Sequence, residues 1–149
     1  MNADIQIAAQ NDIEALLPMI AELYAHERIP FDEAVLRPAV AALLADRAFG
    51  FICLARVDGT PAGYLIVTFG YDIEFGGRQA TVTDVYVQPA FRRRGLAGAA
   101  LRFAEEKCRE HGVRALELQV SDGNTPASDA YEKAGFTMSG RFVMNKRLV

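Results

Sequence analysis

The sequence predicts an α/β fold in which a mixed β-sheet is flanked by about four helices, built as one domain from residues 1–149. Three observations favour this fold class. Segments rich in β-forming residues alternate with amphipathic segments of helical period. Asp58-Gly59 joins two apolar runs, which predicts an antiparallel hairpin. A helix between the strands expected at 79–87 and 115–120 makes a crossover, so these two strands should be parallel.

The first elements follow from the apolar pattern. Residues 5–8 are expected to form a short strand. Asn11 and Glu14 have the spacing of a capping box ahead of a helix whose apolar stripe continues to Tyr24. A second helix is expected over residues 32–45, although each helix contains a proline.

The middle of the chain should supply the centre of the sheet. Two strands are expected at 50–57 and 62–69, on either side of the Asp-Gly turn. A polar connection over 71–78 leads to the strand at 79–87. The central helix follows and should end before Gly112, a residue typical of a helix C-terminus.

The last third predicts a strand, a helix and a closing strand. The strand is expected at 115–120. Thr125-Pro126 is typical of a helix start, and Gly135 should end that helix. Residues 141–149 are expected to form the closing strand.

The turn after the strand at 79–87 has the build of a pyrophosphate site. It carries three consecutive arginines and then Gly95, Leu96, Ala97 and Gly98 at the start of the central helix. Glycines allow the backbone to approach a ligand closely, and the first N–H groups of a helix are free to bind an anion. The residues here therefore predict an anion site.

Two common phosphate-binding motifs do not match this turn. A Walker loop needs Lys-Ser or Lys-Thr after its second glycine, and this chain has Ala97-Gly98-Ala99 there. A dinucleotide-binding fingerprint needs three glycines, and only Gly95 and Gly98 are present. What remains is Arg92-x-x-Gly95-x-Ala97.

This hexamer resembles the acyl-CoA-binding motif of the GNAT superfamily of N-acetyltransferases. Residues 124–136 are similar to the second signature of the family, N-x-x-A-x-x-x-Y-x-K-x-G-F. The resemblance is specific over about 82–136 and only architectural over the first 70 residues. It implies a sheet whose two central parallel strands splay apart to admit the pantetheine arm of acetyl-CoA.

The resemblance implies acetyl-CoA as co-substrate. The backbone of 85–87 would pair with the pantetheine amides, and the amides of 93–98 would hold the pyrophosphate. The residues expected to contact the cofactor are Val85, Tyr86, Val87, Arg92, Arg93, Arg94, Gly95, Leu96, Ala97, Gly98, Gln119, Asn124, Ala127, Tyr131 and Lys133.

The sequence identifies a candidate for the general acid but leaves two candidates for the general base. Tyr131 matches the general-acid tyrosine of the family. The family often carries a general-base Glu where this chain has Thr81 or Thr83, and a threonine cannot take a proton at neutral pH. Asp84 is the nearest carboxylate, but strand alternation points it away from the face of Thr83 unless a bulge redirects it. Glu74, in the connection before the strand, is the other candidate.

A covalent route through a cysteine is not expected. Cys53 lies in an apolar strand and Cys108 on the apolar face of the central helix, so both should be core residues without an activated thiolate. Direct attack of an amine on acetyl-CoA in a ternary complex is therefore favoured.

Composition excludes several other classes. The net charge of −3 argues against non-specific nucleic-acid binding. Two cysteines and two distant histidines indicate no metal site. The sequence has no apolar run long enough to span a membrane, so we expect a cytoplasmic protein without membrane association. Exposed sheet edges make a homodimer a candidate assembly.

The function predicted from the sequence is transfer of an acetyl group from acetyl-CoA to a primary amine of a small molecule. Two alternatives stay open. The acceptor could be the amine of a protein or peptide, which would need an open groove. The chain could also be a non-catalytic acyl-CoA-binding module, because the strand Glu of the family is missing.

Overall fold

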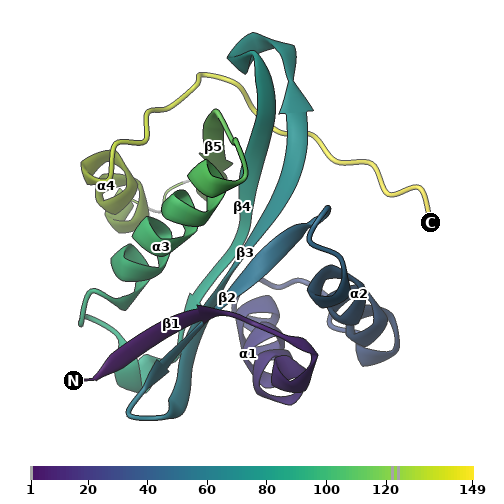
Figure 1. Cartoon of the computed structure of the whole chain (residues 1–149), viewed down its shortest axis with the longest axis vertical. Helices are drawn as coiled ribbons and strands as arrows, with labels where there is room; N and C mark the ends of the chain where they lie inside the picture. The colour runs from purple at the N-terminus through teal and green to yellow at the C-terminus, as the bar shows by residue number, and fades with distance from the viewer. Residues whose placement is uncertain (1, 122, 124) are drawn as a thin grey trace. The chain divides into compact units, whose positions relative to one another are not determined.

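The computed structural model describes residues 2–121, 123 and 125–149, and the chain divides into two compact units, Met1–Gln119 and Val120–Val149. The first unit holds the sheet and three helices, and the second holds the fourth helix (Figure 1). The strands are β1 (Ala3–Ile7), β2 (Gly50–Val57), β3 (Thr60–Asp72), β4 (Gly77–Val87) and β5 (Ala115–Leu118). The helices are α1 (Ile13–His26), α2 (Glu33–Ala45), α3 (Leu96–Glu110) and α4 (Thr125–Lys133).

The sheet is mixed, as the sequence predicts. Its order is β1-β2-β3-β4-β5, with antiparallel pairs up to β4 and a parallel pair between β4 and β5. Asp58 (φ 49°) and Gly59 (φ 82°) both adopt the left-handed conformation that a tight two-residue hairpin turn requires. The predicted hairpin and the predicted crossover through α3 are confirmed.

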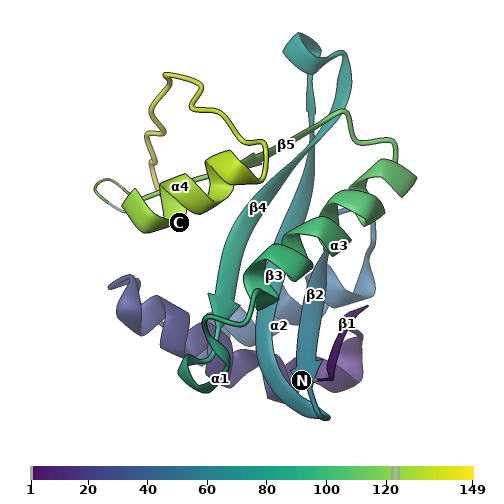
Figure 2. The same cartoon turned by 90° about the vertical axis from the view of Figure 1, so that its left-hand side faces the viewer.

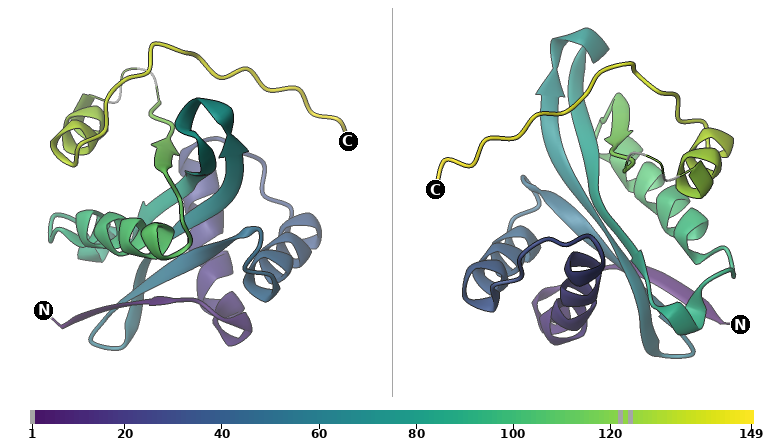
Figure 3. Two further views of the ribbon diagram at one scale, coloured as in Figure 1. Left: turned by 45° about the horizontal axis from the view of Figure 1, so that its top comes forward. Right: turned by 180° about the vertical axis from the view of Figure 1, so that it is seen from behind.

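Helices cover both faces of this sheet. In the first unit, α1 and α2 lie on one face and α3 on the other (Figures 1 and 2). Leu16 and Ile20 of α1 share a core with Ile52 and Ile66 of the sheet, all of them buried. The start of α3 packs on the other face, where buried Leu96 meets apolar side chains of β2 and β3. The view from behind in Figure 3 shows the same layers.

The start of α1 differs from the prediction. The expected capping box of Asn11 and Glu14 is wrong, because α1 begins at Ile13 after a short 3-10 turn, with Asp12 at its N-cap. Asp12 Oδ2 accepts the Ala9 N–H at 2.9 Å, and its Oδ1 accepts a bond from Arg56 at 2.8 Å. Asp12 therefore ties the helix start to β2, a role that the local spacing could not reveal.

The predicted closing strand is also wrong. Residues 141–149 form no strand, and Phe142 and Met144 are 96% and 94% exposed. β-forming residues adopt a strand only when a neighbouring strand satisfies their backbone groups, so their pattern alone does not fix the structure. The strand expected at 115–120 is shorter than predicted and ends at Leu118.

Candidate active site

A β-bulge in β4 decides which side chains face which helices. Ile66 of β3 pairs with Asp84, but the next residue, Val67, pairs with Val82, so Thr83 is an extra residue in β4. Ile66 belongs to the core under α1, and its partner Asp84 therefore lies on that face. Asp84 and Val85 point to opposite faces, as alternation predicts.

β4 extends beyond its parallel partner. The pairing between β4 and β5 ends at Val82 and Leu118, so the last five residues of β4 have no partner strand on that edge in the described part of the chain. The N–H of Gln88 bonds to the Ala62 carbonyl of β3 at 2.8 Å. Because successive residues of a strand turn their backbone groups to opposite sides, Val85 and Val87 direct theirs to the open edge.

The turn that follows β4 exposes backbone donors. Arg93 (φ 63°) and Gly95 (φ 75°) both adopt the left-handed conformation, and α3 begins directly after them. The Ala99 N–H makes the first helical bond, to the Gly95 carbonyl at 3.0 Å. Among the described residues nothing accepts a bond from the amides of 96–98, which sit at the positive end of the helix dipole. This end of α3 can bind an anion.

The arginine side chains have different roles in the turn. Arg92 Nε donates to the Val87 carbonyl at 2.8 Å, and the Arg92 guanidinium lies over the Tyr86 ring at 5.8 Å. Arg92 thus braces the turn against the end of β4. Arg93 and Arg94 are exposed, and Arg94 lies over the Phe91 ring at 5.8 Å. These two add positive charge beside the free amides.

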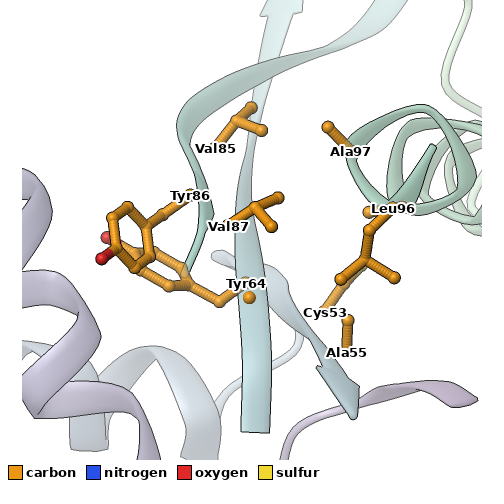
Figure 4. Close-up of a pocket in the computed structure, with 10 residues that line it drawn as sticks. Cys53, Ala55, Tyr64, Val85, Tyr86, Val87, Leu96 and Ala97 are labelled. Carbon is orange, nitrogen blue, oxygen red and sulfur yellow. The ribbon is translucent and has the colours of Figure 1, made fainter. Parts of the chain in front are cut away.

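A small apolar cavity, partly open to solvent, joins the end of β4 to the start of α3. Val85 and Val87 face Leu96 and Ala97 across it, while the rings of Tyr64 and Tyr86 point to the other side of the sheet (Figure 4). The lining residues are Cys53, Ala55, Gly63, Tyr64, Val85, Tyr86, Val87, Leu96, Ala97 and Ala100. The structure thus brings together the expected cofactor contacts from β4 and α3.

Asp84 is the carboxylate nearest this edge of the sheet. Burial raises the pKa of Asp84, and a hydrogen bond from the Tyr64 hydroxyl at 2.9 Å acts in the opposite direction. On the same face the Tyr86 hydroxyl donates to Glu22 of α1. Burial and then this carboxylate raise the pKa of Tyr86 to about 12.

The remaining predicted residues are more scattered. Glu74 is exposed in the short 3-10 turn between β3 and β4, at the opposite end of β4 from the bulge. Gln119 is exposed immediately after β5. Asn124 lies outside the described residues.

The other predicted residues lie in α4, in the second unit. There Ala127 is half-buried and Lys133 is exposed. Tyr131 is half-buried with its ring edge-on to Phe136 at 6.1 Å, and burial raises its pKa.

Sequence reasoning missed Tyr64 and Glu22. Tyr64 occurs in an apolar strand and reads as a core residue, yet a buried tyrosine hydroxyl needs a hydrogen-bond partner. That requirement was the only available signal, and it does not name Asp84 as the partner. Glu22 lies on the polar side of α1 in the sequence pattern, so nothing local marks it.

Comparison with known protein families identifies the family of this chain. The model of the acetyltransferase (GNAT) family matches residues 17–136, most of the chain. The chain belongs to the GNAT acetyltransferase family. This is a family of acyltransferase enzymes that use acetyl-CoA, and the matched range contains both motifs that the sequence analysis singled out.

Individual proteins that are similar to this chain are also named as acetyltransferases. Streptothricin acetyltransferase of Streptomyces lavendulae is 32% identical over 83 residues, which make up 56% of this chain and 42% of that protein. Thialysine N-epsilon-acetyltransferase of Sus scrofa is 31% identical over 143 residues, covering 88% of this chain and 82% of that protein. The chain therefore spans less than half of the first relative and most of the second.

Solved structures share the fold. An integron cassette protein from the mobile metagenome of Cole Harbour Salt Marsh, HFX_CASS3, has a TM-score of 0.86 and 30% identity, covering 97% of this chain and 90% of its own. An aminoglycoside N-acetyltransferase in complex with CoA also has a TM-score of 0.86, at 16% identity, with coverage of 99% and 96%. At 16% identity, the similarity to the aminoglycoside N-acetyltransferase shows a shared fold and nothing further.

Metal-binding groups and membrane-spanning helices are both absent among the described residues. No group of three or more His, Cys, Asp or Glu side chains there could hold a metal ion. None of the helices in that part of the chain is both long and apolar enough to cross a membrane.

Proposed function

We propose that this protein transfers the acetyl group of acetyl-CoA to a primary amine of a small molecule. The observation that carries the proposal is the open edge of β4 beside the free amides of α3. One CoA molecule needs both features, because its pantetheine amides require backbone partners and its pyrophosphate requires donors and positive charge. The match to the GNAT family supports the same donor.

The donor would bind along β4. The backbone groups of Val85 and Val87 pair with the pantetheine arm, and the amides of 93–98 hold the pyrophosphate, with Arg93 and Arg94 beside it. The apolar walls of the cavity accept the arm of the cofactor. By resemblance to the family, Gln119, Asn124, Ala127, Tyr131 and Lys133 are also proposed to contact the cofactor.

The reaction joins the amine nitrogen to the thioester carbonyl carbon and breaks the bond from that carbon to sulfur. Asp84 takes the proton that the attacking amine must lose, and Tyr131 gives a proton to the departing CoA thiolate. Asp84 suits the base better than Glu74, because burial raises the pKa of Asp84 whereas Glu74 is exposed at a hairpin tip.

Direct attack is favoured over an acetyl-cysteine intermediate. A cysteine nucleophile must be ionised, and burial raises the pKa of Cys53 to about 12 and that of Cys108 to about 11. Both thiols are buried in the core and thus stay protonated at neutral pH.

The acceptor is proposed to be a small amine. The two relatives described above are named for streptothricin and thialysine, which are small molecules. In this chain, Asp84 and Glu22 place carboxylates beside tyrosine rings on the face opposite the cavity, and this combination attracts a cationic amine.

Thermal unfolding with acetyl-CoA, CoA and ATP at equal concentrations tests the donor. Ligand at about 100 times its Kd adds about 2.7 kcal/mol to stability, enough to raise the Tm by several degrees at this size. We expect the shift with acetyl-CoA and CoA and a much smaller one with ATP. Equal shifts with all three, or none, contradict an acyl-CoA site.

Release of free thiol from acetyl-CoA, measured with a panel of primary amines and a lysine-containing peptide, tests the reaction. We expect turnover with small amines. Turnover with the peptide alone would favour the protein-amine alternative, and binding without thiol release for any acceptor would favour a non-catalytic acyl-CoA-binding module.

A further inference from the structure

The carboxylate proposed as the base is held by a tyrosine on the neighbouring strand. Tyr64 of β3 lies opposite Tyr86 of β4, which makes it the diagonal neighbour of Asp84 on the same face. The Tyr64 ring is 2% exposed, and its hydroxyl donates to Asp84 Oδ2 at 2.9 Å. Since β3 and β4 are fully paired here, the two groups have little freedom to separate.

The two oxygens of Asp84 have different surroundings. Oδ2 accepts the Tyr64 bond, whereas the described residues offer Oδ1 no hydrogen-bond partner. Across the described part of the chain, no fully buried side-chain N or O atom lacks a hydrogen-bond partner. Oδ1 is therefore in contact with solvent. A carboxylate with one oxygen fixed and the other accessible is well arranged to accept a proton.

Among the described groups around Asp84, Tyr64 is the one that favours the ionised form of this carboxyl. Tyr24 of α1 is close enough that the Asp84 charge, after burial, raises the pKa of that tyrosine. Tyr86 on the same strand directs its hydroxyl to Glu22 of α1 rather than to Asp84. Among the described side chains, no cation forms an ion pair with Asp84.

We infer that Tyr64 is a positioning residue for acetyl transfer: its hydroxyl fixes Oδ2 and keeps Asp84 ionised, which leaves Oδ1 to take the proton of the acceptor amine. This inference rests on the proposed role of Asp84 as the base. The bond itself, however, can be measured without any acceptor.

The direct test is an NMR titration of the Asp84 carboxyl carbon in ¹³C-aspartate-labelled protein, with the signal assigned by Asp84→Asn. Loss of a hydrogen bond to a charged group is worth about one pH unit or more. We expect the midpoint of Asp84 to rise by about that amount in Tyr64→Phe. An unchanged midpoint in the folded variant overturns the inference.

Tyr86→Phe is the matched control. It removes a tyrosine hydroxyl on the same face, also from a buried residue of the sheet, but one that bonds Glu22. The Asp84 midpoint should stay at the wild-type value in this variant, and a rise equal to that of Tyr64→Phe would contradict a specific bond. If Tyr64→Phe fails to fold, 3-fluorotyrosine incorporation replaces it. The more acidic phenol donates more strongly, so the midpoint should then fall, and no change overturns the inference.

The activity test uses 1,4-diaminobutane and acetyl-CoA with thiol release as the signal. We expect the acidic limb of the kcat/KM profile to move to higher pH in Tyr64→Phe by the same amount as the NMR midpoint. A merely structural role would lower the rate at every pH without moving the limb, and would overturn the inference. If wild-type protein acetylates no amine, the proposed function fails, and the NMR titration still decides the role of Tyr64.

Discussion

The burial of Asp84 costs folding free energy, and its proposed role as the base would explain why this position carries a carboxylate. A carboxylate placed against an apolar face loses hydration, and this one receives a single hydrogen bond in return. Buried groups with raised pKa and a specific partner are concentrated at functional sites, because a general base works best with a pKa closer to the working pH. The bulge at Thr83 is the backbone feature that puts Asp84 on this face.

Asp84→Asn should therefore separate activity from stability. Its side-chain oxygen still accepts the Tyr64 hydroxyl, but it cannot take a proton, so we expect acetyl transfer to fall by about 100-fold or more. The folded protein has a raised Asp84 pKa, so the stability contributed by this carboxyl is present below its unfolded pKa and is lost as the pH rises through the folded pKa. Asp84→Asn has no carboxyl at this position, so its stability does not fall with rising pH for this reason.

Urea unfolding of both proteins checks the second half of this prediction. At neutral pH, Asp84→Asn should be as stable as wild type or more stable, and the difference in its favour should shrink as the pH falls through the folded pKa of Asp84. A variant that keeps full turnover would remove Asp84 from the mechanism.

Tyr131 carries the second proton transfer in the proposal. Burial raises its pKa, so the phenol is protonated at neutral pH and able to donate to a thiolate. Tyr131→Phe should lower kcat by about tenfold or more with little change in the Kd for acetyl-CoA. Steady-state rates together with calorimetric binding measure both quantities, and equal kcat values would show that the tyrosine only packs against Phe136.

At the scale of elements, the start of α3 depends on the left-handed conformation of Gly95, the residue at its N-cap. Gly95 (φ 75°) ends the basic turn and allows the next amides to point outward together. Space is not the constraint, since a Cβ at Gly95 would meet no atom within 4 Å. The constraint is the backbone conformation, which costs a residue with a side chain about 1 kcal/mol or more.

Gly95→Ala should thus weaken acetyl-CoA binding by about tenfold, because the strained residue shifts the amides away from the pyrophosphate. Gly59→Ala is a matched control: Gly59 has φ 82° and equally open surroundings, but it lies in the β2–β3 turn. Both variants should lose about 1 kcal/mol of stability, and only the first should lose affinity. Isothermal calorimetry measures this, and a similar loss in both would mean that strain alone weakens binding.

The elements show how far sequence reasoning reaches in this chain. The Asp-Gly hairpin, the crossover and the Arg-Gly turn are local in sequence, and all three were predictable. Two failures concern long-range pairing. Asp12 bonds Arg56 across 44 positions in place of the expected capping box, and residues 141–149 form no strand without a paired neighbour. The Tyr64 bond to Asp84 belongs to the same class, since it depends on strand register.

At the scale of the whole molecule, the two compact units differ in what they bury. Residues 1–119 contain the buried core on both faces of the sheet. None of the described side chains from residue 120 onward is fully buried. A segment of this size without a core cannot supply the apolar burial that offsets its loss of conformational entropy.

We therefore predict that the chain unfolds as a single domain over residues 1–149, in one cooperative transition. Differential scanning calorimetry should show one peak whose calorimetric and van't Hoff enthalpies agree, and acetyl-CoA should move the whole peak to higher temperature. Circular dichroism at 222 nm, followed through the same range, should give the same midpoint. Two peaks, of which acetyl-CoA moves only one, would show that residues 120–149 fold as a separate unit and that the first unit binds the cofactor without them.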